Sequence, residues 1–404
     1  MDRRRAGGSL ADLRRANRDE AVRLLRLHGS MTQAQLARLS GLSHASVSNI
    51  VRDLTQEGTA RVETQQHNGR RSAQVTLNPD SGLVVGVDFG NRHVRVAVAD
   101  MLHNVLAEEY ATLPHGHRSA ESVQRALRII AELVASGGRR MDEIKGMTVG
   151  LPGPIVEGSN RLGSPNILPG WADVDVAESF RKELRVPVVV DNDANLGAVA
   201  ESLWGRGREV RNFAYLKLST GIGAGLVIDG HLYRGSGGMA GEIGHTTIDE
   251  DGPLCRCGNR GCLETMAAAP ALVSLLQGSH GPEFSLEDLL RLGAQGDIGC
   301  RRVIADAGRH IGVAVANLCN LLNPELIIVG GELALAGDVL LSAITDSLSR
   351  RAMSGAAQGT EVVTGALAER TAVLGAIAMA LHDTESGGDG VRPRLVPVGS
   401  AAAR

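Results

Sequence analysis

The chain has 404 residues and a hydrophobic fraction of 43%, enough for two or three globular domains. It has no apolar run of membrane-spanning length, and its first residues, MDRRRAGGSL, lack the apolar stretch of a signal peptide. We therefore expect no membrane partner and a cytoplasmic location. The five cysteines agree with a reducing compartment, because they show no disulfide-type framework.

The net charge of −3 is unevenly distributed. Residues 1–78 hold 13 Arg and no Lys against seven acidic residues, a net charge of +6, so the remainder carries −9. A basic head on an acidic body favours nucleic-acid binding by the head.

The first 78 residues have the pattern of a winged helix-turn-helix. Apolar periodicity predicts a helix over residues 10–28, and Thr32 and Ser43 are placed to cap two further helices, the last stopping near Gly58. A turn at Gly41 joins these two helices, which is the helix-turn-helix arrangement. Two short strands are expected over residues 60–66 and 73–79, joined by the basic tip HNGRRS as a wing.

The third helix is suited to enter the major groove, because its exposed early residues are small or polar while Val47, Ile50, Val51 and Leu54 would face inward. Arginines at the wing tip would reach phosphate or a narrow minor groove. The predicted DNA contacts are Ser43, His44, Ser46, Ser48, Asn49, Arg70 and Arg71. The alternative is a helical protein-interaction module with a solvated hairpin. One head offers few base contacts, so we expect a homodimer or tetramer on a pseudo-palindromic operator.

The body alternates strands and helices, which predicts an α/β fold. Two Gly-containing hairpins, over residues 83–100 and 212–235, indicate two similar lobes. The remaining predicted elements are a helix over 119–137, a buried strand within 146–156, a strand, turn and helix over 187–202, helix over 285–322 and a last helix over 371–383. Residues 384–404 are rich in Gly and Pro, and we expect a disordered tail.

Residues 241–264, GEIGHTTIDEDGPLCRCGNRGCLE, contain four candidate ligands of a soft divalent metal: His245, Cys255, Cys257 and Cys262. Zinc takes four such groups at tetrahedral corners. A Cys3His set is a closed structural site with no position for activated water, which argues against a zinc hydrolase. The alternative is three small buried cysteines beside an unrelated histidine. Cys300 and Cys319 lie in apolar helical surroundings and are expected to be buried.

The string GEIGH followed by CRCGNRGCLE resembles the ROK family (repressors, open reading frames and kinases), which contains sugar kinases and sugar-responsive repressors. The resemblance implies an α/β chain in which a winged helix-turn-helix, residues 1–78, precedes a two-lobed actin-like ATPase (RNase H-like) domain, residues 82–383. Lobe one would comprise about 82–198 plus 367–383, and lobe two about 199–366. In this family a structural zinc braces a sugar pocket between the lobes.

The resemblance also implies which residues bind sugar. Carboxylates suit this role because a charged acceptor strengthens each hydrogen bond from a hydroxyl. The implied contacts are Asn166, Asn192, Asp193, Glu242, His245 and Glu264. In the kinases of the family, the aspartate at the position of Asp193 is the general base. The alternatives are that the two glutamates are solvated surface charges and that Asp193 only caps the helix starting at Ala194.

Two phosphate loops are implied by Asp88 and Gly90 in the first hairpin and by Thr220, Gly221 and Gly223 in the second. Kinases of the family usually have Asp-x-Gly-Gly-Thr-Lys in the first loop, whereas this chain has Asn91-Arg92-His93 after Gly90. These bulkier residues crowd the phosphate site, so we do not expect ATP or Mg²⁺, although residual kinase activity stays open.

The predicted function is therefore a sugar-responsive DNA-binding regulator, a repressor of genes for carbohydrate uptake or metabolism. Its effector would be a sugar or a sugar phosphate. The alternative function is an ATP-dependent, glucokinase-like sugar kinase.

Overall fold

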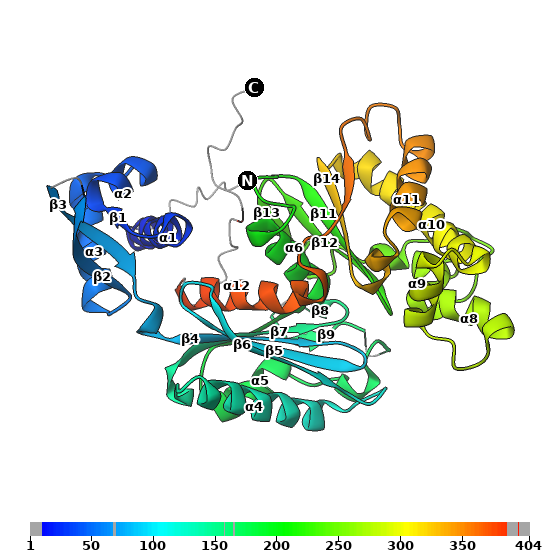
Figure 1. The fold of residues 1–404 in the computed structure, drawn as a ribbon, viewed down its shortest axis with the longest axis horizontal. Coiled ribbons are helices and arrows are strands. Elements are labelled where there is room, and N and C mark those ends of the chain that lie inside the picture. Colours follow the sequence, from blue (N-terminus) through cyan, green and yellow to red (C-terminus); the bar gives the residue numbers. More distant parts are fainter. Residues whose placement is uncertain (1–9, 68–69, 157, 165, 386–394, 396–404) are drawn as a thin grey trace, which may run out of the picture.

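The structure, a computed structural model, describes residues 10–67, 70–156, 158–164, 166–385 and 395. Figure 1 shows a small head joined to two larger α/β lobes. This agrees with the predicted fold class. No helix among the described residues is long and apolar enough to cross a membrane.

The head is a winged helix. Its helices are α1 (Leu10–His28), α2 (Gln33–Ser40) and α3 (His44–Gln56), and its three-stranded sheet has the order β1 (Met31–Thr32), β3 (Arg70–Leu77), β2 (Ala60–His67). Thr32 caps α2 through a reciprocal capping box with Gln35, and the Ser43 hydroxyl caps α3 by accepting from the Ser46 N–H. Both caps lie where the sequence predicts them. Strand β2 is one residue longer than predicted, and β3 begins three residues earlier and ends two residues earlier than the predicted 73–79, because Asn78 and Pro79 form a turn.

The first lobe is a five-stranded sheet of order β10-β7-β4-β5-β6. The helices α4 and α5 cover one face and α12 covers the other (Figure 1). The elements are β4 (Leu83–Phe89), β5 (His93–Asp100), β6 (Val105–Thr112), β7 (Ile144–Leu151), β10 (Val188–Asn192), α4 (Ser119–Ser136), α5 (Val176–Leu184) and α12 (Thr371–Glu385), with a small ribbon of β8 (Ile155–Val156) and β9 (Arg161–Leu162).

The second lobe repeats this topology, as the paired hairpins of the sequence indicate. Its sheet has the order β13-β12-β11-β14-β15. In each sheet three strands pair antiparallel (β4, β5 and β6, or β11, β12 and β13), and two further strands extend the sheet by parallel pairing (β7 and β10, or β14 and β15). The elements are β11 (Phe213–Leu218), β12 (Ile222–Ile228), β13 (His231–Tyr233), β14 (Leu326–Gly330), β15 (Glu361–Thr364), α6 (Asp193–Trp204), α7 (Leu263–Ala267), α8 (Ala269–His280), α9 (Leu286–Ala294), α10 (Ile298–Leu322) and α11 (Asp338–Arg351).

Two expectations change in detail. The helix predicted over 285–322 is two helices, α9 and α10, because the chain turns at Gly296 with φ +95° and Asp297 caps a new helix. The disordered tail predicted over 384–404 begins too early, because residues 384–385 are the end of α12. Leu395 is buried, and its N–H donates to the Gly230 carbonyl. The other positions of the predicted tail lie outside the described residues. Cys300 and Cys319 are buried, as predicted.

Candidate functional site

A cleft of about 340 Å³ lies where the ends of β4, β11 and β12 approach the loop that follows β13. The sequence-predicted Asn192, Asp193, Glu242, His245 and Glu264 all line it, together with residues of both phosphate-like hairpins. Asn166 lies at its margin, where its side-chain amide donates to the Arg256 carbonyl (3.3 Å). Residues far apart in the chain thus line one cleft together. Its volume is typical of small-molecule sites.

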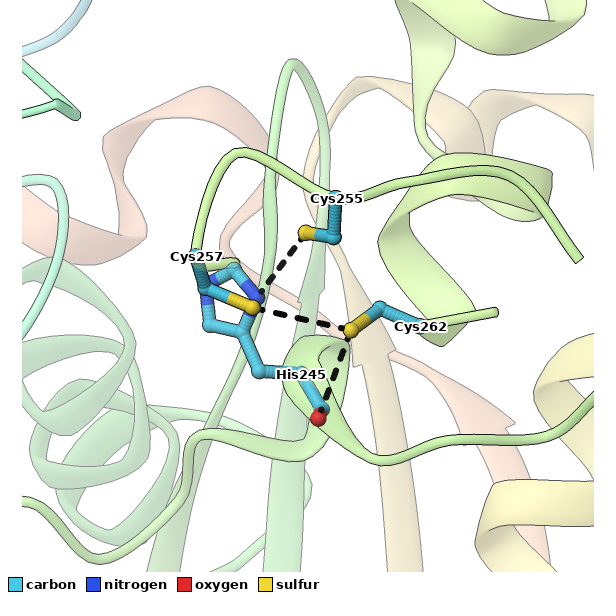
Figure 2. Close-up of side chains that lie close together, drawn as sticks. All are labelled: His245, Cys255, Cys257 and Cys262. Atoms are coloured by element: carbon cyan, nitrogen blue, oxygen red, sulfur yellow. Dashed lines mark hydrogen bonds between the residues drawn. The ribbon is translucent and has the colours of Figure 1, made fainter. Parts of the chain in front are cut away.

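The four predicted metal ligands converge, with their ligand atoms all within 4.8 Å of one another (Figure 2). A zinc ion about 2.3 Å from sulfur and about 2.0 Å from nitrogen places tetrahedral neighbours about 3.8 Å apart for two sulfurs and about 3.5 Å for sulfur and nitrogen. The separations are 3.7 Å between Cys257 Sγ and Cys262 Sγ, and 3.5 Å between Cys255 Sγ and His245 Nδ1. The donor set therefore fits a tetrahedral zinc site.

The chemistry of the thiols also favours a cation. Burial and the neighbouring thiols raise the pKa of Cys262 to about 12, and burial raises the pKa of Cys255. Three thiolates side by side repel one another unless a divalent cation neutralises them. The loop that presents them depends on Gly261, where φ is +64° and an added Cβ would lie 1.5 Å from the Asp249 carbonyl oxygen.

The metal cluster adjoins the two glutamates implied in sugar binding. His245 directs Nδ1 toward Cys255 and Nε2 toward Glu242, whose Oε2 lies 3.9 Å away. Burial, Asp193 and Glu264 raise the pKa of Glu242 to about 7. Glu264 accepts from the Ile222 N–H (3.1 Å) and pairs with Arg256 (2.9 Å). Both glutamates are thus held inside the cleft, against the alternative of solvated surface charges.

The turn between β10 and α6 separates the roles of two neighbouring residues. Asn192 is the N-cap of α6: its Oδ1 accepts from the N–H groups of Ala194 and Asn195, and its amide donates to the Gly153 carbonyl. Asp193 is not the cap, contrary to the alternative raised from sequence. Its carboxylate Oδ2 lies 2.5 Å from Lys217 Nζ.

The two phosphate-like loops contact each other directly. The side-chain amide of Asn91 donates to Thr220 Oγ1 over 2.6 Å. His93 Nε2 lies 3.3 Å from Asp88 Oδ2, and the His93 ring crowds Gly90, where an added Cβ would lie 2.2 Å from it. The substitutions noted in the sequence therefore fill the first loop and link it to the second.

The candidate DNA-binding surface is the outer face of α3. His44, Ser48 and Asn49 are exposed, Ser46 is half-buried, and Val47, Val51 and Leu54 are buried in the core of the head, with half-buried Ile50 packed beside them. The Ser43 hydroxyl is engaged as the N-cap. Strand β3 begins at Arg70, but the side chains of Arg70 and Arg71 lie outside the described residues.

Comparison with known proteins shows the family to which the chain belongs. A family model described as ROK family matches residues 84–383, and one described as MarR family matches residues 21–71. The chain belongs to the ROK family. It is 31% identical over 373 residues to a protein from Caldicellulosiruptor bescii named Xylose repressor, covering 87% of this chain and 92% of the relative.

Solved ROK structures differ in how much of the chain they match. A ROK family transcriptional regulator described as a homolog of the E. coli MLC protein has a TM-score of 0.80 at 26% identity, and the match covers 93% of this chain and 98% of that one. A ROK family glucokinase from Streptomyces griseus, in complex with glucose and AMPPNP, has a TM-score of 0.65 at 26% identity, with 74% and 100% covered.

Sequence reasoning missed several residues of the ROK cleft. Lys217 is the one charged residue of the otherwise apolar strand FAYLKL. A lone charge in such a strand indicates a partner of opposite charge, so this residue could have been found from the sequence. Arg256 stands between two metal ligands and pairs with Glu264, and Glu332 accepts from the Ser219 hydroxyl (2.9 Å). Nothing in their local sequence indicates these pairings.

Proposed function

We propose that this ROK protein is a sugar-responsive transcriptional repressor of carbohydrate genes, which binds operator DNA through α3 and the wing and an effector sugar in the cleft. The observation that carries the proposal is the presence, in one chain, of an exposed polar recognition helix and a carboxylate-lined cleft. The C. bescii relative named Xylose repressor aligns with most of both chains, which supports the same role here.

The effector is a sugar or sugar phosphate that contacts Asn166, Asn192, Asp193, Glu242, His245 and Glu264. Acceptor oxygens predominate among these groups, which suits the hydroxyl groups of a sugar. The side-chain amide of Asn192 already makes hydrogen bonds to three backbone groups. Its main contribution to sugar binding is therefore to fix the turn that positions Asp193. The name of the C. bescii relative makes xylose the first compound to test.

We infer that zinc is the resident metal, held by His245, Cys255, Cys257 and Cys262. When bound, it would neutralise the thiolates and fix the loop that leads into α7, where Glu264 lies. Through His245 it would also fix the side of the cleft next to Glu242. Its role is structural, because four protein ligands complete the tetrahedral shell.

We further propose that the protein acts as a homodimer or tetramer on a pseudo-palindromic operator, since a symmetric pair of heads would read two half-sites. The domain limits are proposed at 1–78 and 82–383, and the two five-stranded sheets support the further division into lobes.

The kinase alternative retains Asp193 and the second glycine-rich hairpin in its favour. Against it, the Asn91–Thr220 hydrogen bond and the His93 ring occupy the region where loop amides would cradle phosphate. An assay of ADP release across a panel of sugars separates the two functions.

The proposal is tested by thermal-shift screening with xylose, glucose, N-acetylglucosamine and their phosphates, followed by footprinting on the chain's own promoter region. A ligand at about 100 times its Kd stabilises the protein by about 2.7 kcal/mol. We expect one sugar to stabilise the wild type and to change protection of a site with dyad symmetry. Protection of DNA without dyad symmetry would contradict the dimer, and no response to any sugar would contradict the effector role.

A further inference from the structure

The cleft contains a half-buried cation for which the proposed contacts give no role. Lys217, on β11, directs its ammonium at Asp193, at the start of α6, with 2.5 Å between Nζ and Oδ2. The Asp193 side chain is 8% exposed and that of Lys217 is 21% exposed. Both residues line the cleft, so the pair lies where the sugar is proposed to bind.

A second buried carboxylate completes this cluster. Asp88, at the end of β4, is 3% exposed. Its Oδ2 lies 3.3 Å from His93 Nε2, and its Oδ1 has no hydrogen-bond partner among the described residues. Burial alone would lower the pKa of Lys217, but the carboxylates of Asp193 and Asp88 outweigh that effect and raise it. Burial raises the pKa of Asp193, Lys217 lowers it and the charge of Asp88 raises it, so the three groups share one electrostatic environment.

Two neighbouring carboxylates in a dry site repel each other and need a compensating cation. In enzymes that transfer phosphoryl groups, divalent metal ions held by carboxylates neutralise the charge that develops on phosphate. A protein that binds sugar without nucleotide does not recruit a metal–nucleotide complex. A residue of its own chain must therefore supply the positive charge that offsets the carboxylates.

We propose that the ammonium of Lys217, bonded to Asp193, supplies the positive charge that a divalent cation would otherwise provide to this group of carboxylates, which makes Lys217 a positioning residue of the sugar site. Its bond to Oδ2 fixes the Asp193 carboxylate, leaving Oδ1 to accept from a sugar hydroxyl. The proposal rests on the proposed function, sugar binding without nucleotide, but its test below uses neither sugar nor operator.

The test is Mn²⁺ binding to the zinc-loaded protein, followed by electron paramagnetic resonance of the free ion. Mn²⁺ prefers oxygen ligands, and Lys217→Met keeps the bulk of the side chain but removes the ammonium that is bonded to Asp193. We expect the variant to bind Mn²⁺ at least about tenfold more tightly than the wild type, a difference of about 1.4 kcal/mol. Adding Asp88→Asn should abolish the gain, and Lys145→Met, at an exposed lysine of β7, should behave as wild type.

Lys217→Arg keeps the positive charge and should bind Mn²⁺ no better than the wild type, which gives a result even where the methionine variant folds poorly. The proposal is overturned by an unchanged Mn²⁺ affinity in Lys217→Met, or by an equal gain in Lys217→Arg. Because this readout needs neither sugar nor operator, it is independent of whether the proposed effector is correct.

A separate set of contacts links the head to the cleft through the turn between β5 and β6. The Asp100 carboxylate organises this turn by accepting from the N–H groups of Leu102 and Asn104. On one side, Leu102 packs against the core of the head, and Arg26 of α1 donates to the Met101 carbonyl (3.1 Å).

On its other side, the turn meets the end of α6. The His103 ring packs edge-on against Trp204, with 5.3 Å between ring centroids. Burial and the charge of Arg26 lower the pKa of His103 to about 3, so the ring stays neutral and makes an apolar contact. Trp204 is the last residue of α6 and Asp193 is the first. A rigid helix of 12 residues, about 18 Å long, thus runs from the cleft to the turn that holds the head.

We infer that the turn at residues 100–104 transmits movement of α6 to the head, and that the His103–Trp204 contact is its coupling point. This rests on the proposed function, and the variant that tests it is His103→Asn. Asparagine tolerates the left-handed backbone of His103 (φ +69°) but removes the ring contact. Leu106→Ala, at an exposed residue of the same hairpin, is the control.

For His103→Asn we expect sugar affinity and sugar-free operator affinity within about threefold of wild type, with the sugar-induced change in operator affinity reduced at least about fivefold. A full sugar response in this variant would overturn the inference. The absence of any response in the wild type would instead contradict the proposed function, so the two failures are distinguishable.

Discussion

Glu264 offers a sharp test of the sugar site, because its carboxylate has a structural role and a proposed role in sugar binding. It accepts from the Ile222 N–H (3.1 Å) and pairs with Arg256 (2.9 Å) in a cleft where its side chain is 11% exposed. Glu264→Ala removes a charged acceptor for a sugar hydroxyl, worth about 1.5–3 kcal/mol. The Kd for the cognate sugar should therefore rise about 10- to 150-fold.

The same substitution should lower stability, because the buried Ile222 N–H loses its acceptor at a cost of about 1–3 kcal/mol. Glu264→Gln keeps an acceptor for that N–H and should restore most of the stability while restoring only part of the sugar affinity. Glu283→Ala, at an exposed glutamate of the same lobe, is the control. Calorimetric titration and thermal unfolding separate the two effects. A Kd within twofold of wild type in folded Glu264→Ala would refute the assignment of Glu264 to sugar binding.

Three other predictions concern the metal and the head. Cys257→Ser should release zinc, lower the melting temperature and remove the sugar response together, as checked by metal analysis of purified protein; a variant that responds fully without metal would contradict a structural zinc. Gly261→Ala should also lose zinc, because its Cβ clashes with the Asp249 carbonyl. Gly258→Ala is strained by a positive φ as well (+94°) but has free space around the added Cβ, so it should retain more metal. Replacing Arg70 and Arg71 by Ala should weaken binding to all DNA sequences and reduce the salt slope by about 0.9 per lost phosphate contact. Asn49→Ala should instead alter base preference, and equal effects from both changes would contradict this division of roles.

The parts of the fold that the sequence predicts correctly are those determined by neighbouring residues. Thr32 and Ser43 cap α2 and α3 because a hydroxyl satisfies an N–H two or three positions away. The metal cluster is likewise local, since its three cysteines fall within eight residues and a glycine-containing loop brings them together.

Contacts between distant segments could not be predicted in this way. Lys217 and Asp193 are 24 residues apart and meet only after β11 and α6 pack. Asn91 and Thr220 are 129 residues apart and meet only because the two lobes approach each other. The alternative role of Asp193 as a helix cap follows local rules, but Asn192 takes that role instead.

The central claim is that sugar binding, without chemistry, alters the affinity for DNA. The most direct measurement is the operator Kd by fluorescence anisotropy, at fixed salt and without ATP, with and without the cognate sugar. We predict a change of about 5- to 150-fold, the usual range of coupling between two sites. An unchanged operator Kd, together with sugar-dependent ATP turnover of about 1–100 per second, would contradict it and establish a kinase.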